Sequence, residues 1–112
     1  MNARLNYVEL PAPDIGAAKR FYEKAFGWSL TTVAPTYAAT MTGDTDIGLQ
    51  GDAADATRVP LAVIEVDDLE AAFDAVWTAG GTIVRPIFSF PGGRRFQFLD
   101  PCGNELACVR SG

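Results

Sequence analysis

Residues 6–28 read NYVELPAPDIGAAKRFYEKAFGW, and this stretch predicts a strand followed by a capped helix. The strand covers residues 3–10 and ends at Pro11, because proline cannot donate to a sheet ladder. Asp14 then lies where its carboxylate can accept the free amides of a first helical turn. Apolar residues follow at helical spacing, and Gly27 is the residue type that ends helices in the left-handed conformation.

The same pattern recurs in the second half of the chain. Residues 61–66 predict a strand, and Asp67 or Asp68 caps a second helix, with Asp67 and Glu70 spaced for a capping box. The apolar face of this helix is expected to comprise Leu69, Ala72, Phe73, Val76 and Trp77, with Gly80 and Gly81 ending the helix. The remaining strands are expected at residues 28–33, 36–41, 46–50, 82–86, 93–98 and 104–110.

The two halves match at one constant offset. Under it Asp14 meets Asp68, Ala18 meets Ala72 and Gly27 meets Gly81, so that cap, helix face and terminating glycine agree together. The polar stretch 51–58 has the composition of a linker. We therefore expect a single domain, 1–112, made of two βαβββ modules at about 1–50 and 59–112.

Composition excludes several classes of function. The chain has 112 residues, a net charge of −5, two cysteines and no histidine. No basic cluster exceeds Arg94–Arg95, which argues against a nucleic-acid partner. No apolar run has the length of a signal peptide or a membrane span, so we expect a cytoplasmic protein with reduced thiols and no membrane partner.

Three stretches resemble the vicinal-oxygen-chelate superfamily, which holds glyoxalases, bleomycin resistance proteins and dioxygenases. They are residues 6–28, the IEVDDL of residues 64–69, and the FLDPCGNEL of residues 98–106. The resemblance implies an α+β fold in which the two βαβββ modules form a curved mixed sheet around a cavity, and it implies a homodimer. It is specific for fold and weak for function, because the superfamily contains many activities.

The resemblance also implies where a metal would be bound. Its first-strand ligands fall on Tyr7 and Leu61, and its last-strand ligands fall on Gly48 and Ala107. These positions offer a neutral phenol and otherwise no donor atom, whereas a divalent cation needs several donors on one centre. We therefore expect no metal and no other cofactor. A slip of one residue would instead bring the nearby carboxylates Glu65 and Glu105 inward.

Alternation along the strands predicts which residues line the cavity. Phe96 and Phe98 are assigned to the helix-facing core, which leaves Arg95 and Gln97 on the cavity side. The segment 86–91 is expected to be irregular, exposed and placed over the mouth. The predicted ligand-binding residues are Tyr7, Glu9, Gln50, Leu61, Val63, Phe88, Arg95, Gln97 and Ala107.

The roles of the polar residues in this set stay open. Glu9 is a candidate general base; the alternatives are an ion pair with Arg95 or another cation, or a solvated position at the rim. Tyr7 is either a hydrogen-bonding wall or plain packing. Arg94 and Arg95 either bind a carboxylate or phosphate or form a solvated hairpin end. No catalytic residue is assigned, because neither cysteine has a histidine to activate it.

Two functions are the main candidates, and a partner-binding role without a small ligand also stays open. The first is a metal-free protein that binds a small organic ligand, such as a drug or metabolite, as a homodimer. The alternative is a glyoxalase- or dioxygenase-like enzyme, a lyase or isomerase, acting on a small organic substrate. Such an apolar pocket with few polar groups suits either function.

Overall fold

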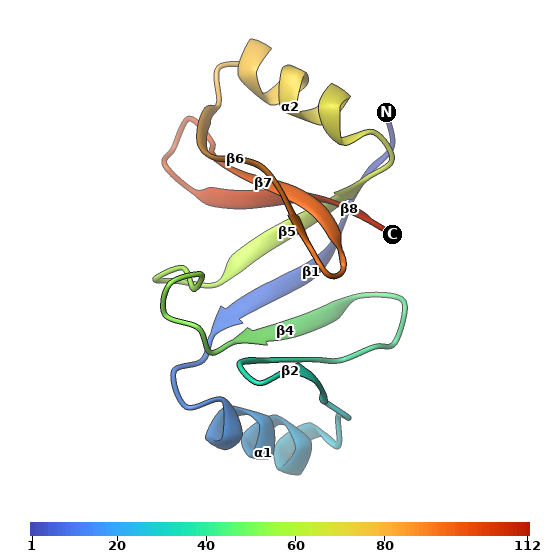
Figure 1. Cartoon of the computed structure of the whole chain (residues 1–112), viewed down its shortest axis with the longest axis vertical. Helices are drawn as coiled ribbons and strands as arrows, with labels where there is room; N and C mark the ends of the chain where they lie inside the picture. Colours follow the sequence, from blue (N-terminus) through green and yellow to red (C-terminus); the bar gives the residue numbers. More distant parts are fainter. The chain divides into compact units, whose positions relative to one another are not determined.

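The computed structural model describes all of residues 1–112. In chain order the elements are β1 (Ala3–Pro11), α1 (Ile15–Phe26), β2 (Thr31–Ala34), β3 (Tyr37–Ala39), β4 (Asp46–Gln50), β5 (Leu61–Val66), α2 (Leu69–Thr78), β6 (Thr82–Phe90), β7 (Gly93–Leu99) and β8 (Glu105–Ser111) (Figure 1). Neither helix is long and apolar enough to cross a membrane.

The chain folds as two compact units. The first module is Tyr7–Leu61, and the second module is Ala62–Gly112 together with Met1–Asn6. Strands of the first module lie in the order β2-β3-β4-β1, and those of the second in the order β5-β8-β7-β6. Each module also carries one helix, so the predicted α+β fold with two βαβββ modules is confirmed.

The two modules share one pattern of strand pairing. In the first, parallel pairing joins Glu9 to Gly48, and in the second it joins Val63 to Ala107. The antiparallel neighbours also correspond, since Ala39 pairs with Gly48 and Gln97 pairs with Ala107. Residues at matching register positions are called counterparts below. Tyr37 and Arg95 are counterparts by the same rule, because they pair with Gln50 and Val109, respectively.

Local capping explains where each helix begins. Asp14 accepts a hydrogen bond from the Ala17 amide at 3.0 Å, and Asp68 accepts one from the Ala71 amide at 3.0 Å. At the end of α1, Gly27 has a φ of 69°, a left-handed conformation that glycine adopts without steric cost. These features agree with the sequence prediction.

The predicted capping box in α2 is wrong. The cap is Asp68, which puts Glu70 one residue too early to reach back to the cap amide. The Asp67 carboxylate instead accepts a hydrogen bond from the Asn2 amide at 2.9 Å. Glu70 pairs with Arg94 on β7, with an N–O distance of 2.6 Å.

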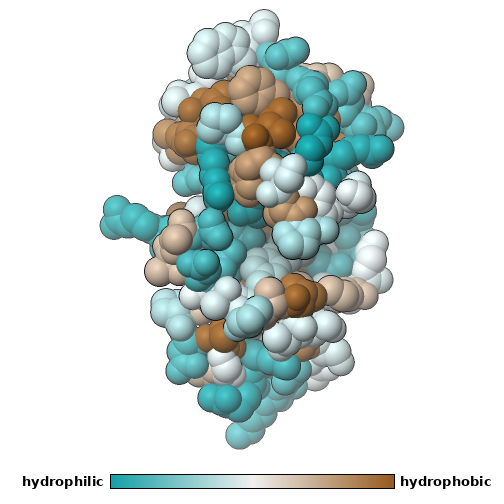
Figure 2. Space-filling view, in the orientation of Figure 1, coloured by the Kyte–Doolittle hydropathy of each residue, from teal (hydrophilic) through white to brown (hydrophobic).

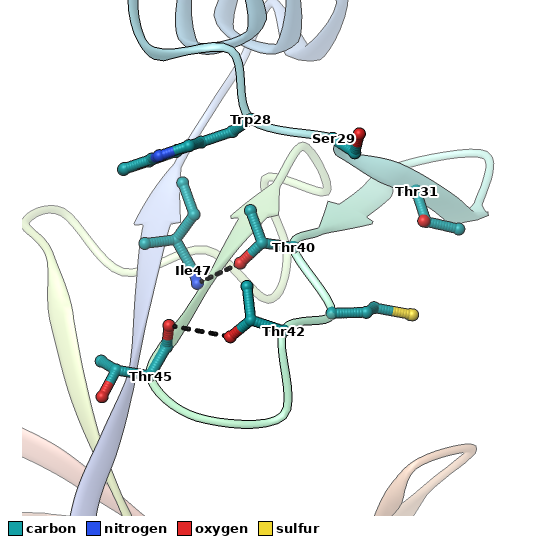
Figure 3. Close-up of a pocket in the computed structure, with 8 residues that line it drawn as sticks. Trp28, Ser29, Thr31, Thr40, Thr42, Thr45 and Ile47 are labelled. Atoms are coloured by element: carbon teal, nitrogen blue, oxygen red, sulfur yellow. Dashed lines mark hydrogen bonds between the residues drawn. The ribbon is translucent and has the colours of Figure 1, made fainter.

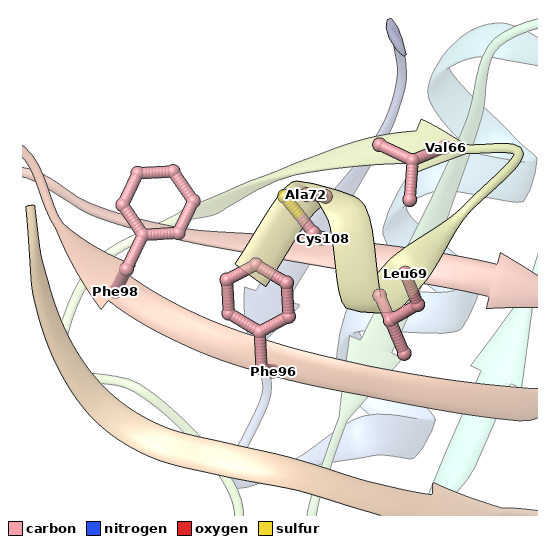
Figure 4. Packing of buried hydrophobic residues seen from close by; sticks show 6 residues of the cluster. All are labelled: Val66, Leu69, Ala72, Phe96, Phe98 and Cys108. Atoms are coloured by element: carbon pink, nitrogen blue, oxygen red, sulfur yellow. The ribbon is translucent and has the colours of Figure 1, made fainter. Parts of the chain in front are cut away.

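Each helix covers an apolar cluster of its own module. In the first module the buried members are Ala12, Leu30, Ala38 and Leu49. In the second they are Val66, Leu69, Ala72, Phe96, Phe98 and Cys108. Figure 4 shows these side chains around α2, which itself contributes Leu69 and Ala72. Phe96 and Phe98 thus belong to the helix-facing core as expected. Trp77 does not, because it lies at the edge of the apolar stripe in the last turn and remains 67% exposed.

One strand is longer than the sequence indicated. Residues 86–90 were expected to be irregular, yet β6 runs to Phe90 and pairs with β7 along its length. Register shifts fall between Ile83 and Arg85 and between Arg85 and Phe88. Pro86 lies within the second shift, where the ladder is interrupted and a proline needs no amide to donate. Because of this bulge, β6 continues beyond Pro86.

Candidate functional site

Strand alternation divides the side chains of each module into two faces. In the first module, Leu10, Ile47 and Leu49 pack with the cluster beneath α1. Because successive side chains point to opposite faces, Glu9 and Gly48 belong to the face away from the helix. We call this surface the inner face of the module.

A chain of hydrogen bonds lies on the inner face of the first module. The hydroxyl oxygens of Tyr7 and Tyr37 are 2.6 Å apart, and the Tyr37 hydroxyl donates to Oε1 of Glu9 at 3.0 Å. Glu9 is only 2% exposed, so it does not lie in water at a rim. Tyr7 also makes a specific polar contact rather than plain apolar packing. Tyr37 was absent from the predicted site because it lies on a different strand, 30 residues from Tyr7.

Gly48 provides the space in which the two phenols meet. A Cβ atom added to Gly48 would overlap both the Tyr7 hydroxyl and the Tyr37 hydroxyl. The position that the resemblance assigned to a last-strand metal ligand is therefore filled by side chains from neighbouring strands. Position 48 must be glycine for the two tyrosine hydroxyls to pack against it.

Burial raises the pKa of Tyr37 far above its ordinary value. The negative charge of Glu9 and the nearby Tyr7 hydroxyl raise this pKa further. The phenol of Tyr37 is therefore neutral at physiological pH and keeps the proton that it donates to Glu9.

Gln50 is held by local structure on the same face. It is 9% exposed, and its Oε1 accepts a hydrogen bond from the Asp52 amide at 2.9 Å. This contact fixes the start of the segment that follows β4. The side-chain oxygen of Gln50 thus serves the turn, whereas its amide nitrogen can still donate.

A second polar chain lies on the inner face of the second module. Arg95 donates to Oε1 of Gln97 at 3.2 Å, and the Gln97 amide nitrogen donates to Oε2 of Glu105 at 2.6 Å. The Arg95 guanidinium carbon is also 5.3 Å from the ring centre of Phe88, close enough for a cation–π contact. The structure therefore brings Arg95, Gln97 and Phe88 together, and it adds Glu105.

Arg94 and Arg95 do not form a joint anion site. Arg94 points to the opposite side of β7 and forms a forked pair with Glu70, at 2.6 and 3.3 Å. Arg95 lies on the inner face with Gln97. Alternation along the strand separates the two guanidinium groups, so of the two alternatives that the sequence left open, joint binding of one anion does not fit this geometry.

The aliphatic members of the predicted site are all buried, whereas Phe88 is partly buried. Leu61 is 1% exposed, Val63 is 3% exposed and Ala107 is fully buried. Their strand neighbours Ile64 and Leu106 pack beneath α2, so Val63 and Ala107 belong to the inner face of the second module. Whether the nine residues form one ligand site stays a prediction.

The donor atoms do not fit a metal centre of the expected type. Tyr7, Gly48, Leu61 and Ala107 carry no carboxylate, imidazole or thiolate. No group of three or more His, Cys, Asp or Glu side chains in the chain could hold a metal ion. The nearby carboxylates serve other contacts, since Glu65 accepts from Ser111 at 3.0 Å and Glu105 accepts from Gln97.

An open pocket of about 390 Å³ lies elsewhere on the first module, and the sequence did not indicate it. It is lined by Trp28, Ser29, Thr31, Thr40, Met41, Thr42, Thr45 and Ile47 (Figure 3). Two of its threonine hydroxyls already donate hydrogen bonds within the protein. Thr40 donates to the Asp46 carboxylate at 2.7 Å, and Thr42 donates to the same carboxylate at 2.9 Å. The pocket thus follows from the way the β3–β4 turn is built.

The fold and the sequence together define the family. A family model for the Glyoxalase/Bleomycin resistance protein/Dioxygenase superfamily matches residues 4–108. A glyoxylase-like domain-containing protein from Didymella fabae is 31% identical, with 100% of this chain and 98% of that protein covered. The chain therefore belongs to the glyoxalase/bleomycin resistance protein/dioxygenase superfamily.

Solved structures agree on the fold. A methylmalonyl-CoA epimerase from Mycobacterium tuberculosis has a TM-score of 0.76 and 17% identity, with 97% of this chain and 88% of that chain covered. A Mn(II)-bound glyoxalase from Novosphingobium aromaticivorans has a TM-score of 0.70 and 20% identity. That match covers 97% of this chain and 40% of the glyoxalase chain. These likenesses extend to the fold and not to the activity.

Proposed function

We propose that this chain binds a small organic molecule on the inner face of its first module, without a metal of the family type. The observation that carries the proposal is the replacement of expected metal ligands by Gly48 and by the phenols packed against it. Each inner face combines buried apolar side chains with a few fixed polar groups. Such a mixture is typical of small-molecule sites.

Charge narrows the class of ligand. The chain carries a net charge of −5, which favours cationic over anionic molecules near its surface. The polar groups on the first inner face are two phenols, a carboxyl group and the side-chain amide of Gln50, and none of these is cationic. A neutral or cationic drug-like molecule or metabolite is therefore the proposed ligand.

The test begins with metal content. Purified protein is incubated in turn with Ni, Zn, Mn and Fe(II), desalted and subjected to elemental analysis, and we expect no stoichiometric metal. A ligand screen by thermal shift follows, with and without EDTA, beginning with cationic molecules. Tyr7→Phe should weaken a genuine hit, whereas the exposed helical substitution Asp74→Ala should not. One metal retained per chain would overturn the metal-free proposal, and a screen without hits would overturn ligand binding.

A second candidate function is an acid–base enzyme of the lyase or isomerase class. It is favoured by one observation, a 2% exposed carboxyl group held by a phenol, because buried carboxyl groups are frequent general bases. Turnover of isomerase or dioxygenase substrates, lost in Glu9→Gln, would support this function. Ligand binding without turnover would support sequestration.

We also propose that the protein is a cytoplasmic homodimer. Several large apolar side chains remain exposed, among them Phe21 at 59%, Phe26 at 61% and Trp77 at 67%. Figure 2 shows brown, apolar groups at the surface of each module. A second copy would remove such area from water, which matters in a small domain. Sedimentation equilibrium tests this proposal, and a monomer at micromolar concentration would contradict it.

A further inference from the structure

The open pocket of the first module lies on the helix-facing side of its strands. Ile47 lines this pocket and also packs with the cluster beneath α1, whereas its strand neighbour Gly48 belongs to the inner face. The pocket volume of about 390 Å³ is within the range of small-molecule sites. A molecule bound in this pocket would therefore occupy a place separate from the inner face.

One wall of the pocket is the indole ring of Trp28, which is 41% exposed. Tyr22 is stacked on this ring at a centroid distance of 5.6 Å, with the two ring planes 10° apart. The ring of Phe26 lies 5.2 Å from the same indole. Figure 3 shows the indole between α1 and Ile47. Helix α1 therefore supports one face of the indole, and the opposite face is turned toward the pocket.

A second wall is the turn between β3 and β4, whose shape is fixed by hydrogen bonds within the protein. The Asp46 carboxylate accepts from the Thr40 and Thr42 hydroxyls at 2.7 and 2.9 Å. It also accepts from the backbone amides of Thr42 and Gly43 at 2.9 and 3.1 Å. A wall that is already ordered reduces the conformational entropy that binding would cost.

The polar groups that this pocket leaves for a ligand are few and uncharged. None of the side chains that line it carries a charge. The hydroxyls of Ser29, Thr31 and Thr45 make no hydrogen bond within the protein. A charged ligand would lose hydration without meeting a countercharge, and a sugar would bring more hydroxyls than these groups can satisfy. The lining therefore favours a neutral molecule with a large flat face and few polar atoms.

We propose that this pocket is a second ligand site, which binds a neutral planar heteroaromatic molecule of about the size of a purine. The ring stacks on the open face of Trp28, and its polar edge bonds to the nearby hydroxyls. Met41 is 63% exposed, and its flexible thioether can pack against the bound ring through sulfur–aromatic contact. This site does not rest on the ligand site proposed for the inner face.

Adenosine is the probe, because it is neutral and carries a planar base. Binding to the full chain is followed by two-dimensional NMR, with the backbone amides of residues 40–47 as reporters. We expect saturable shifts with adenosine at millimolar concentration and none with ribose, which lacks the base. Adenosine monophosphate should bind more weakly, because its charge has the same sign as the net charge of −5.

Four results of this titration would overturn the proposal. They are the absence of a saturable shift with adenosine, shifts centred on β1 instead of residues 40–47, equal shifts with ribose, and tighter binding of adenosine monophosphate than of adenosine.

Substitutions at the two tryptophans test the stacking. Trp28→Leu should weaken adenosine binding about 5- to 100-fold, the range for one base stacked on an aromatic side chain. Trp77→Leu makes the same chemical change at an exposed position of the second module and should leave the affinity unchanged. Trp28→Phe keeps an aromatic ring and should restore part of the affinity. Equal affinity of the wild type and a folded Trp28→Leu, as judged by circular dichroism, would overturn the role of Trp28.

A fluorescence readout leaves the pocket itself unchanged. The chain has two tryptophans, so Trp77→Phe leaves Trp28 as the only indole fluorophore. Adenosine should change the Trp28 emission with the same dissociation constant as in the NMR titration, and ribose should not. An emission that saturating adenosine leaves unchanged would overturn the stacked geometry. A negative result concerns this pocket alone, because metal content and Tyr7→Phe test the inner-face proposal.

Discussion

The two modules share one backbone pattern and fill it with different side chains. On the helix-facing side, Phe96 of the second module has Ala38 as its counterpart in the first, and Cys108 has Leu49. On the inner face, Glu9 of the first module has Val63 as its counterpart, and Gly48 has Ala107. The second module therefore has the larger aromatic core, whereas the first carries the tyrosine chain.

The two helices also differ in how deeply their side chains are buried. Helix α2 buries Leu69 and Ala72 nearly completely, whereas α1 has no buried residue at all. In α1 the aromatic side chains gather on the surface instead, with Tyr22 stacked on Trp28 at a centroid distance of 5.6 Å. A duplicated fold thus allows the two copies to differ in their core and inner-face side chains, because strands pair through backbone groups.

The largest effect is expected in the aromatic core. Phe96→Ala should lower the free energy of unfolding by about 3–5 kcal/mol, because it leaves a large cavity beneath α2. The reverse change at its counterpart, Ala38→Phe, should cost about 1–3 kcal/mol through overpacking. Urea denaturation followed by circular dichroism measures both. A loss below about 1 kcal/mol for Phe96→Ala would show that the two cores are equivalent after all.

The second-largest effect on stability is expected from substitutions on the inner faces of the modules. Gly48→Ala should cost about 1–3 kcal/mol, because the added methyl group meets both tyrosine hydroxyls. Ala107→Gly, the matched change in the second module, should cost about 0.5–1 kcal/mol through backbone entropy. The cost of Gly48→Ala should fall in a Tyr37→Ala background. Equal costs in both backgrounds would mean that the phenols do not create the requirement for glycine.

The helix caps should not distinguish the modules. Asp14→Ala and Asp68→Ala should each cost about 1 kcal/mol, because each carboxylate accepts one amide of its first turn at 3.0 Å. Asp74→Ala, in the exposed middle of α2, serves as a control and should change stability little. Thermal unfolding measures all three. Unequal cap effects would indicate that one helix depends on its tertiary packing alone.

The smallest expected effect is a loss of fold stability at low pH. Burial tends to raise the pKa of Asp46, but hydrogen bonds from Thr42, Thr40 and Gly43 lower it overall. The side-chain and backbone hydrogen bonds of Asn104 likewise lower the pKa of Asp100. A carboxyl group whose pKa is lower in the folded state than in the unfolded state stabilises the fold at pH values above its unfolded pKa of about 4. This stabilisation is lost as the pH falls through the pKa of the folded state.

Asp46→Asn and Asp100→Asn should therefore flatten the loss of stability between about pH 5 and pH 3, one in each module. The effect should be small because both carboxylates are reached by solvent. Urea denaturation at a series of pH values measures it. A wild-type slope that neither substitution changes would assign acid sensitivity to other carboxyl groups.

Much of this protein was determined by its sequence alone. The aspartate caps, the glycine that ends α1, the recurring strand-and-helix order and the assignment of Phe96 and Phe98 to the core all follow from local chemistry and strand alternation. The absence of donors at the expected metal positions also follows, because a side chain's donor atoms do not depend on the fold. These features require only neighbours in the sequence.

Only the tertiary structure decided how the polar residues are joined. Tyr37 meets Tyr7 and Glu9 through pairing of β3, β4 and β1, and it lies 28 residues from Glu9 in the sequence. The same pairing turned Gly48 from an empty ligand position into the space that two phenols share. The extension of β6 past Pro86 likewise needed β7 as a partner. Contacts between distant strands depend on register and bulges, which no local pattern of residues specifies.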